Sequence, residues 1–225
     1  MNFPARGIRS FVLRAGRITP AQKRALEELW PRHGIVYMPT PLDLDRVFGR
    51  AAPRVLEVGF GDGDTLVELA GRSPERDFIG VEVHPPGVGH CLLQIESGGL
   101  TNVRVVAHDA VEVLTHQLAP ACLDEVLLYF PDPWPKKRHH KRRIVQPAFV
   151  ALVADRLKPG GRFKLATDWE RYAAWMLDVL DASPAFANAA PGGGFIDRPQ
   201  RGETRFERRG QRLGHRVLDL EYVRN

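Results

Sequence analysis

From residue 54 onward, short apolar runs alternate with segments of helical periodicity. The runs lie at 54–58, 78–83, 103–107, 125–130 and 162–166, and the helical segments at 64–72, 87–97, 111–118, 144–157 and 169–182. Strands that are apolar along their whole length are buried on both faces, as in parallel sheets with helical crossovers. The pattern therefore predicts an α/β fold with a Rossmann-like, doubly wound, mostly parallel sheet and helices on both faces. The alternating run 216–223 predicts an antiparallel edge strand.

The two ends of the helical segments carry recognisable stop and start signals. Thr19-Pro20-Ala21-Gln22 combines a capping box with proline at the first helical position, which predicts a helix from residue 20 to about Trp30, ended by Pro31 and Gly34. Lys158-Pro159-Gly160-Gly161 is expected to end the fourth crossover helix. With 225 residues, we expect one domain over 19–225, preceded by a basic arm over 1–18 that need not be ordered.

Composition limits the cellular setting. Hydrophobic residues make up 44% of the chain, but no apolar run approaches the roughly 18 residues of a membrane helix, so we expect no membrane association. Cys91 and Cys122 are the only cysteines, they lack the spacing of a zinc site, and no secretory segment precedes them. A cytoplasmic location follows; an organellar transit peptide is the alternative for the arginine-rich start, and the helix that follows at once disfavours it.

Charge is strongly segregated along the chain. Residues 1–26 contain six Lys/Arg and no acid, residues 136–143 contain six and no acid, and residues 198–216 contain seven Arg against two Glu. These segments sum to +17 while the whole chain carries +5, so the remainder carries −12. An acidic body with three basic patches indicates a polyanionic partner such as nucleic acid. Solvated loops that bind nothing are the alternative for any one patch.

The loop after the first predicted strand is rich in glycine, with Gly59, Gly61 and Gly63. Such a loop lies where ligands bind in open α/β sheets, and it suits either a dinucleotide or S-adenosylmethionine. The alternative without a ligand is a strand-to-helix turn that needs glycine only for close packing. In the dinucleotide fingerprint the third small residue would fall at Asp64, where a carboxylate is a poor neighbour for pyrophosphate. A nicotinamide oxidoreductase is therefore disfavoured.

Carboxylates follow or end each of the first three predicted strands, at Glu57, Glu82 and Asp109. S-adenosylmethionine offers a sulfonium, an ammonium and a ribose diol, which all favour carboxylate partners. The loop resembles the E-x-G-x-G-x-G motif of class I methyltransferases. That resemblance implies a class I methyltransferase fold, with Glu57 near the methionine end of the cofactor, Glu82 on the ribose hydroxyls and Asp109 near the adenine amino group.

The fourth predicted strand ends in Phe130-Pro131-Asp132-Pro133-Trp134-Pro135, followed by Lys136-Lys137-Arg138-His139-His140-Lys141-Arg142-Arg143. Two prolines restrict the backbone around Asp132 beside the expected cofactor. Trp134 offers a face on which an unpaired base can stack, and the basic run can neutralise phosphates. Adjacent His139 and His140 are poorly arranged for one tetrahedral ion and no carboxylate follows nearby, so we predict no metal.

Seven segments resemble the bacterial tRNA (guanine-N7)-methyltransferases in order and spacing, from about residue 9 to the C-terminus: LEVGFGDG, GVEVHPPGVG, HDAVEVL, FPDPWPKKRHHKRR, LKPGG, ATDWERYA and TRFERRGQRLGH. The resemblance implies methyl transfer from S-adenosyl-L-methionine to guanine N7 in tRNA, at the variable-loop position 46, with S-adenosyl-L-homocysteine as the second product. Asp62, Pro135 and Arg205 depart from the residues frequent in that family, and none of these departures removes a carboxylate.

The resemblance also assigns roles on the substrate side. It implies Asp132 as the catalytic carboxylate, also beside the cofactor, and Lys136 and Asp168 as substrate contacts. It implies an RNA-contacting segment and a late substrate motif, formed by Arg138, His139, His140, Lys141, Arg142 and Arg143, and by Thr204, Arg205, Phe206 and Glu207. No obligate protein partner is evident. An RNA-binding module with a vestigial pocket and a methyltransferase acting on a small molecule or protein remain alternatives at this point.

Overall fold

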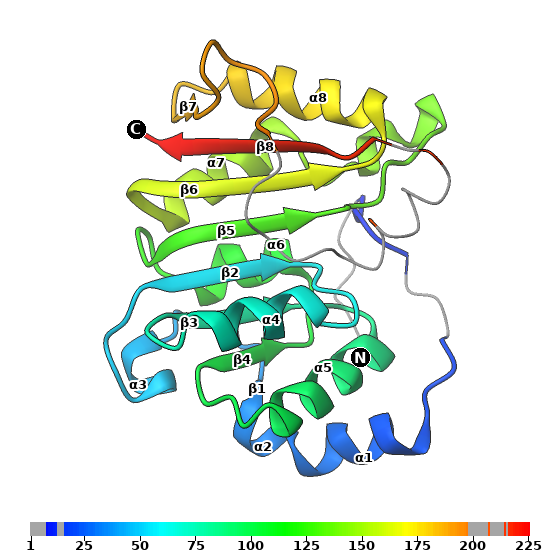
Figure 1. Ribbon diagram of the computed structural model, residues 1–225, viewed down its shortest axis with the longest axis vertical. Coiled ribbons are helices and arrows are strands. Elements are labelled where there is room, and N and C mark those ends of the chain that lie inside the picture. Colours follow the sequence, from blue (N-terminus) through cyan, green and yellow to red (C-terminus); the bar gives the residue numbers. More distant parts are fainter. Residues whose placement is uncertain (1–7, 13–15, 198–206, 208–213, 215) are drawn as a thin grey trace.

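The computed structural model describes residues 8–12, 16–197, 207, 214 and 216–225 of the chain. Within these residues, an eight-stranded sheet has the order β1-β4-β3-β2-β5-β6-β8-β7 (Figure 1). The strands are β1 (Gly34–Ile35), β2 (Arg54–Val58), β3 (Asp77–Val81), β4 (Val103–Val106), β5 (Leu123–Tyr129), β6 (Leu157–Thr167), β7 (Phe186–Asn188) and β8 (Leu218–Arg224).

The directions of the strands confirm the predicted mostly parallel sheet. Strands β1 to β6 pair in parallel, and β8 is antiparallel to both β6 and β7. The arrowheads of β2, β5 and β6 accordingly point to one side and that of β8 to the other (Figure 1). The antiparallel strand near the C-terminus is thus present, with the short β7 added outside it. The strand order reverses between β2 and β5, so a ligand site is expected outside the carboxyl ends of these two strands.

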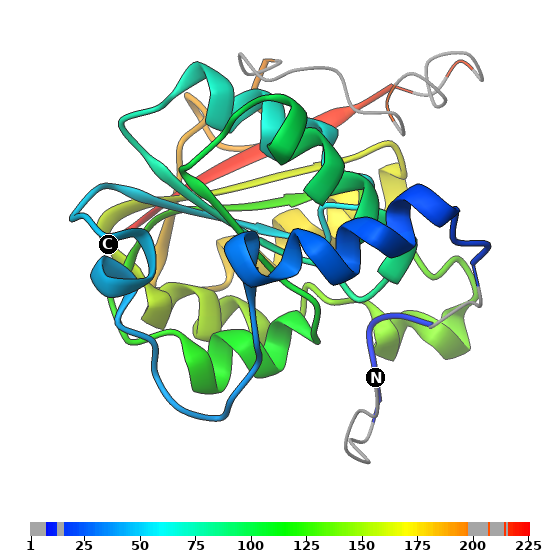
Figure 2. The same cartoon turned by 90° about the horizontal axis from the view of Figure 1, so that it is seen from below.

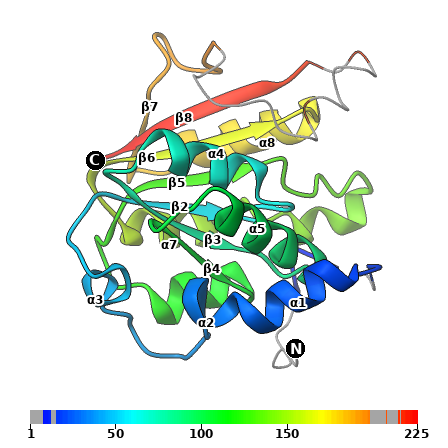
Figure 3. The ribbon, with the colours of Figure 1, turned by 60° about the horizontal axis from the view of Figure 1, so that its bottom comes forward.

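Helices cover both faces of the sheet, as predicted. One face carries α1, α4 and α5, and the other carries the remaining long helices (Figures 1 and 3). The helices are α1 (Pro20–Glu28), α2 (Trp30–His33), α3 (Leu44–Phe48), α4 (Asp64–Arg72), α5 (Pro85–Ser97), α6 (Ala110–Glu112), α7 (Pro147–Arg156) and α8 (Glu170–Asp181), with the π-helix η1 (Val113–Gln117) and the 3₁₀-helix η2 (Lys137–Arg142). None of the helices in the described ranges is long and apolar enough to span a membrane.

The sheet separates two hydrophobic cores. Leu66, Val88 and Leu92 belong to the core beneath α4 and α5, whereas Phe149 and Met176 belong to the core beneath α7 and α8. Helix α1 runs along α5 (Figure 2). A Cβ atom on Gly89 would lie 2.7 Å from the Gln22 carbonyl oxygen, so the glycine allows the two helices to approach closely. Both cores extend to the carboxyl ends of the strands, because Val58 of β2 lies in the core beneath α7 and α8 and Tyr129 of β5 lies in the core beneath α4 and α5.

The first helix begins where the capping box predicts. The Gln22 amide donates to Thr19 Oγ1 at 3.2 Å, and the Thr19 amide donates to Gln22 Oε1 at 2.8 Å. The helix ends at Glu28, and Pro31 lies in the first turn of the separate short helix α2, where a missing N–H group costs nothing. The predicted break is thus present, but Pro31 starts a helix there and does not terminate one.

Two further segments differ from the prediction. The helix expected at 111–118 is a three-residue α-helix followed by the π-helix η1, closed by the bond from the Leu118 amide to the Val113 carbonyl at 3.2 Å. The fourth crossover helix already ends at Arg156, so the expected helix stop at 158–161 lies inside β6. Pairing of Leu157 with Leu123 starts this strand early, before a register shift against β5.

Candidate functional site

A cavity of about 550 Å³ lies at the carboxyl ends of β2 and β5, where the strand order reverses. It is lined by six of the residues predicted to bind the cofactor or act in catalysis: Glu57, Gly59, Gly61, Glu82, Asp109 and Asp132. The structure thus brings Glu57, Glu82 and Asp109 together with the Pro-Asp-Pro loop, although these segments are well separated in the sequence. One cavity of this size can hold a nucleoside-sized ligand beside a second reactant.

The glycine-rich loop follows β2 and leads into α4. Gly59, Gly61 and Gly63 have φ angles of 72°, 60° and 87°, the left-handed region that other residues rarely adopt. Gly63 is also constrained by space, since a Cβ atom there would lie 2.6 Å from the Cβ and Sγ atoms of Cys91 on α5. Gly63 is the N-cap of α4 and, unlike the other two glycines, does not line the cavity.

Glu82, directly after β3, ties this loop to the next strand. Its Oε2 atom accepts from the Gly61 amide at 2.9 Å, and its Oε1 atom accepts from the amides of Val83 at 2.6 Å and His84 at 3.0 Å. Burial raises the pKa of the Glu82 carboxyl, against the lowering effect of these three hydrogen bonds. Each carboxylate oxygen has two lone pairs, so Oε2 retains acceptor capacity for a ligand hydroxyl.

Glu57, at the end of β2, is an almost fully buried carboxyl with an unsatisfied oxygen. The residue is 3% exposed, and its Oε2 atom has no hydrogen-bond partner among the described residues. Burial, and then the negative charge of Glu82, raise the pKa of Glu57 to about 8. A buried polar atom without a partner is costly, so the site favours a ligand that brings a donor, and a cationic donor most of all.

Asp109 lies after β4, and the Pro-Asp-Pro loop follows β5. Strands β3 and β2 lie between β4 and β5, so the two segments are at opposite sides of the cavity. Its Oδ1 atom accepts from the Val111 amide at 2.9 Å and so caps α6, while the residue remains only 2% exposed. The preceding His108 also lines the cavity, stacks on Tyr37 with ring centroids 3.7 Å apart, and contacts Glu112 Oε2 through Nε2 at 2.6 Å. The His108 ring, held by Tyr37 and Glu112, is therefore the aromatic surface of the cavity next to Asp109.

The lining of the cavity fits a cationic ligand better than a phosphate. None of its described lining residues is Lys or Arg, whereas Glu57, Asp62, Asp64, Glu82, Asp109 and Asp132 are acidic. A dinucleotide pyrophosphate would meet repulsive charges here. The S-adenosylmethionine predicted from the sequence carries the sulfonium and ammonium that such a lining attracts.

The loop that carries Asp132 has an unusual backbone. Phe130 and Trp134 have φ angles of 50° and 45°, although neither is glycine, and these values are sparsely populated for residues with a side chain. The Phe130 amide donates to the Ala166 carbonyl of β6 at 2.8 Å, which anchors the start of the loop. Asp132 is exposed at the cavity rim, between Pro131 and Pro133.

Trp134 joins three segments. Its Nε1 atom donates to the Ser10 carbonyl at 3.1 Å, the Arg142 guanidinium lies 5.1 Å from its ring centroid, and the His139 ring meets it edge-on at 5.8 Å. The predicted stacking face is therefore in contact with a cation of the basic run on one side. Ser10 and Phe11 line the cavity as well, and the sequence pattern did not single them out.

The basic run forms the 3₁₀-helix η2, with Lys136 as its N-cap. Lys136, Lys137, Arg138 and Lys141 are exposed, and His139, His140 and Arg142 are partly exposed. Burial, and then the surrounding positive charges of Arg138 and Arg142, lower the pKa of His139. Arg143, the last basic residue of the run, is instead 4% exposed. The run therefore presents a cationic surface beside Asp132, from which Arg143 is set apart.

The remaining predicted substrate residues are distributed between described and undescribed segments. Asp168 is partly exposed between β6 and α8, and Glu207 is 1% exposed. Thr204, Arg205 and Phe206 lie outside the described residues, as does most of the basic segment 198–216. Among the residues that are described, no three of His, Cys, Asp or Glu are grouped as a metal ion would require.

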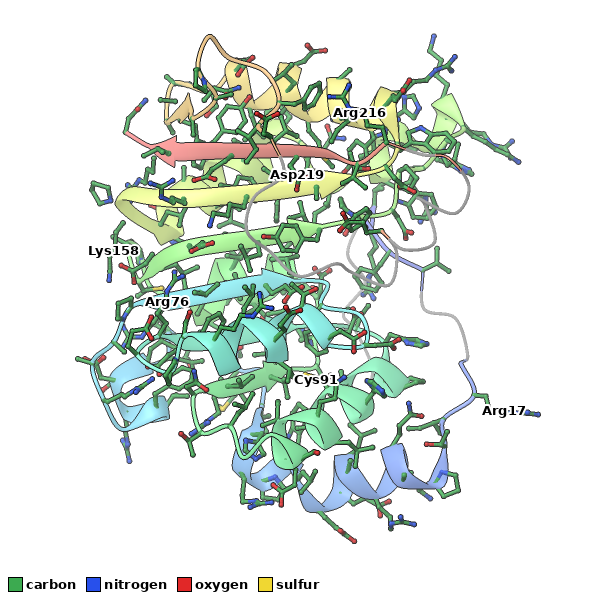
Figure 4. All side chains as sticks on the ribbon, in the orientation of Figure 1. Arg17, Arg76, Cys91, Lys158, Arg216 and Asp219 are labelled. Carbon is green, nitrogen blue, oxygen red and sulfur yellow. The ribbon has the colours of Figure 1, made fainter. Side chains whose placement is uncertain are left out.

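A second cavity, of about 640 Å³, contains none of the predicted site residues. It is lined by paired charges, including Glu125 with Arg76 at 2.7 Å and with Lys164 at 2.6 Å, and Lys158 with Asp124 at 2.9 Å. Arg76 and Lys158 lie at the left of Figure 4, the side on which β2, β5 and β6 begin. Its cations are paired with neighbouring carboxylates, so the first cavity is the better candidate for a ligand site.

Comparison with known proteins gives both close and distant matches. A family model described as "Putative methyltransferase" matches residues 51–220. The tRNA (guanine-N(7)-)-methyltransferase of Halorhodospira halophila is 58% identical over 96% of this chain and 95% of the relative. The protein of the same name from Alkalilimnicola ehrlichii is 58% identical over 96% of this chain and 92% of the relative.

Solved structures match at the level of the fold. The 16S rRNA methyltransferase KamB has a TM-score of 0.59 at 16% identity, over 81% of this chain and 93% of that one. A 16S rRNA (adenine(1408)-N(1))-methyltransferase from Catenulisporales acidiphilia, solved with its cosubstrate SAM, has a TM-score of 0.54 at 20% identity, over 81% and 92% of the two chains. The sheet and its helices are thus those of class I methyltransferases.

Proposed function

The chain belongs to the tRNA (guanine-N(7)-)-methyltransferase family, and on that premise we propose that it transfers a methyl group from S-adenosyl-L-methionine to N7 of the variable-loop guanine at position 46 of tRNA. The products are 7-methylguanosine in tRNA and S-adenosyl-L-homocysteine. The observation that carries the proposal is the single cavity that joins the acidic pocket to Asp132. We propose further that the enzyme acts in the cytoplasm, as one domain over 19–225, without a metal or an obligate protein partner.

The acidic pocket supports S-adenosylmethionine as the methyl donor. Glu57 offers a buried carboxylate oxygen that lacks a partner, which suits the ammonium of the methionine end. Glu82 holds the loop backbone and keeps a lone pair for the ribose hydroxyls. Asp109, beside the His108 ring, suits the adenine amino group.

The chemistry of guanine N7 limits what Asp132 has to do. N7 is an acceptor with a free lone pair and carries no proton, so methyl transfer needs no general base. The bound cosubstrate supplies a methyl group on a sulfonium; the bond from N7 to the methyl carbon forms as the bond to sulfur breaks, and the positive charge passes to the purine. Asp132 accepts from the N–H edge of the base and stabilises that charge.

Contacts with the RNA come from the basic surface beside Asp132. The exposed Arg138 and Lys141 of η2 neutralise phosphates. Lys136, in the segment after β5, and Asp168, directly after β6, approach the substrate. The partly exposed His139, His140 and Arg142 belong to the same surface. Thr204 to Glu207 are proposed as a further substrate motif on the strength of the family resemblance alone.

A methylation assay with nucleoside mapping tests the function. Wild-type protein incubated with S-adenosylmethionine and tRNA should yield 7-methylguanosine in the variable loop. Asp132→Ala should abolish transfer while it spares cofactor affinity in calorimetry, and Asp178→Ala, which removes an exposed carboxylate of α8, should leave both unchanged. Methylation of another nucleoside would refute the acceptor assignment, and near-normal turnover of Asp132→Ala would refute the role of that residue.

The salt dependence of tRNA binding tests the basic surface. Each phosphate contact contributes roughly 0.7–0.9 to the log–log slope, so replacement of Arg138 and Lys141 by alanine should reduce the slope by about one to two. Lys158→Ala is the matched control, because Lys158 lies at the opposite ends of the strands (Figure 4). An unchanged slope in the double variant would mean that η2 does not touch the RNA backbone.

A further inference from the structure

Arg143 differs from every other basic residue of the 136–143 run in its burial. Its exposed fraction is 4%, whereas Arg138 and Lys141 are exposed. A side chain so withdrawn from solvent cannot reach the phosphates of a bound RNA unless the surrounding structure opens. Burial of a guanidinium is also costly without compensation, so the contacts that it makes inside the protein indicate what it does there.

The guanidinium packs against two aromatic rings of α8. Its central carbon lies 4.7 Å from the ring centroid of Tyr172 and 5.8 Å from that of Trp175. The rings are themselves fixed: Trp175 Nε1 donates to the Val145 carbonyl at 2.7 Å, and the Tyr172 hydroxyl accepts from the Val145 amide at 3.3 Å. The faces of these rings attract the cation and hold it in one place.

From this position Arg143 reaches the loop that carries Asp132. Its Nε atom donates to the Pro133 carbonyl at 3.0 Å, and a terminal nitrogen lies 3.3 Å from His140 Nε2. The loop enters and leaves through Phe130 and Trp134, both with positive φ. A backbone in this region needs contacts from outside the loop to keep it in place, and the bond to Pro133 is such a contact, one residue after Asp132.

We propose that Arg143 is a positioning residue that fixes the Pro131–Pro133 turn to α8 and thereby sets the place of Asp132. The inference rests on the proposed function for the role of Asp132. It assigns Arg143 a contact within the protein, with Pro133, in place of the RNA contact expected from the sequence. Because α8 begins two residues after Asp168, the same contact ties together the two loops that supply carboxylates to the acceptor side. Guanine can be held only when both loops keep their relative position.

Arginine chemistry suits this task better than lysine would. The guanidinium presents its Nε–H to Pro133 while its central carbon lies over the ring of Tyr172, and an ammonium cannot do both at once. Burial lowers the pKa of Arg143, with the nearby Tyr172 acting in the opposite direction. Arg143→Lys therefore keeps a charge in the sequence and removes the geometry, which makes it the decisive substitution.

The test compares Arg143→Lys with Arg46→Lys, the same change at an exposed arginine of α3 that has no part in the proposed site. Under saturating tRNA and S-adenosylmethionine, Arg143→Lys should lower kcat by about 100-fold, since a misplacement of about 1 Å can cost that much. Its cofactor affinity and the salt slope of its tRNA binding should match those of the wild type. Arg46→Lys should retain kcat. A reduced slope with a normal kcat in Arg143→Lys would overturn the proposal and make Arg143 a phosphate contact.

A measurement without methyl transfer separates this inference from the proposed function. Proline has no backbone N–H, so residues 130–135 have three exchangeable amides, those of Phe130, Asp132 and Trp134. Hydrogen exchange at these amides should be faster in Arg143→Lys than in the wild type. Trp175→Phe, which keeps a ring and removes its hydrogen bond to Val145, should have a smaller effect in the same direction. Unchanged exchange in both variants would refute the positioning role, whether or not the wild type methylates tRNA.

Discussion

Replacement of Glu57 by glutamine should stabilise the ligand-free protein at neutral and alkaline pH. Burial raises the pKa of Glu57 from 4.5 to about 8, so the folded protein binds this proton more tightly than the unfolded chain does. The stability that the proton contributes is fully present below pH 4.5 and is lost as the pH rises through 8. From the difference between the two pKa values, the folded protein loses at most about 5 kcal/mol of this stability at pH 8 and about 3 kcal/mol at pH 7. Glutamine keeps the shape and does not ionise, so it avoids this loss.

Urea unfolding between pH 5 and pH 8, in the absence of cosubstrate, measures the effect. The free energy of unfolding of Glu57→Gln minus that of the wild type should rise from below about 1 kcal/mol at pH 5 to several kcal/mol at pH 8. Glu75→Gln, which changes an exposed carboxylate, should show no such rise. A difference that is constant with pH, or a variant that is less stable than the wild type at pH 8, would refute the reasoning.

The same substitution should have the opposite effect on ligand binding. An amide cannot pair with the ammonium of S-adenosylmethionine as a carboxylate can, so Glu57→Gln should bind the cosubstrate at least tenfold more weakly. Without ligand the variant would be more stable than the wild type, and added cosubstrate would stabilise it only slightly further. Such a trade between stability and binding is typical of a carboxyl group buried for function.

Three further substitutions have defined outcomes. A Cβ atom on Gly87 would lie 2.2 Å from the Gly61 carbonyl oxygen, so Gly87→Ala should weaken cosubstrate binding in calorimetry and cost about 1–3 kcal/mol in urea unfolding, although alanine favours helices. Burial would raise the pKa of Glu125, but Lys164 holds it below its usual value; Glu125→Gln should therefore lose about 3 kcal/mol at pH 7, and the difference from the wild type should shrink as the pH falls below 4. Thr19→Ala removes the cap of α1 and should cost about 1 kcal/mol in thermal unfolding.

The central strands and the carboxylates at their ends were predictable because their signals are local. A strand buried on both faces must be apolar at successive positions, as in Val55, Leu56 and Val58, so its run stands out in the sequence. Carboxylates at the ends of such strands meet at one edge of a parallel sheet whatever the loops do. The sequence alone therefore assigns Glu57 and Glu82 to one pocket, and both line the same cavity.

The residues that escaped prediction depend on contacts between distant segments. The two residues of β1, Gly34 and Ile35, are too few to show a period. Ser10 meets Trp134 across 124 positions, and nothing near residue 10 indicates that contact. Arg143 stands in a uniformly basic run, so its sequence neighbours predict exposure, and only the rings of α8 explain its burial.

The separation of the two hydrophobic cores by the sheet bears on how such enzymes diverge. Core substitutions far apart and without shared partners add in their effects, so changes beneath α7 and α8 should show little epistasis with changes beneath α4 and α5. Substitutions can then accumulate in one core without disturbing the packing of the other. In this architecture the two halves of the hydrophobic interior can diverge at different rates behind one shared site.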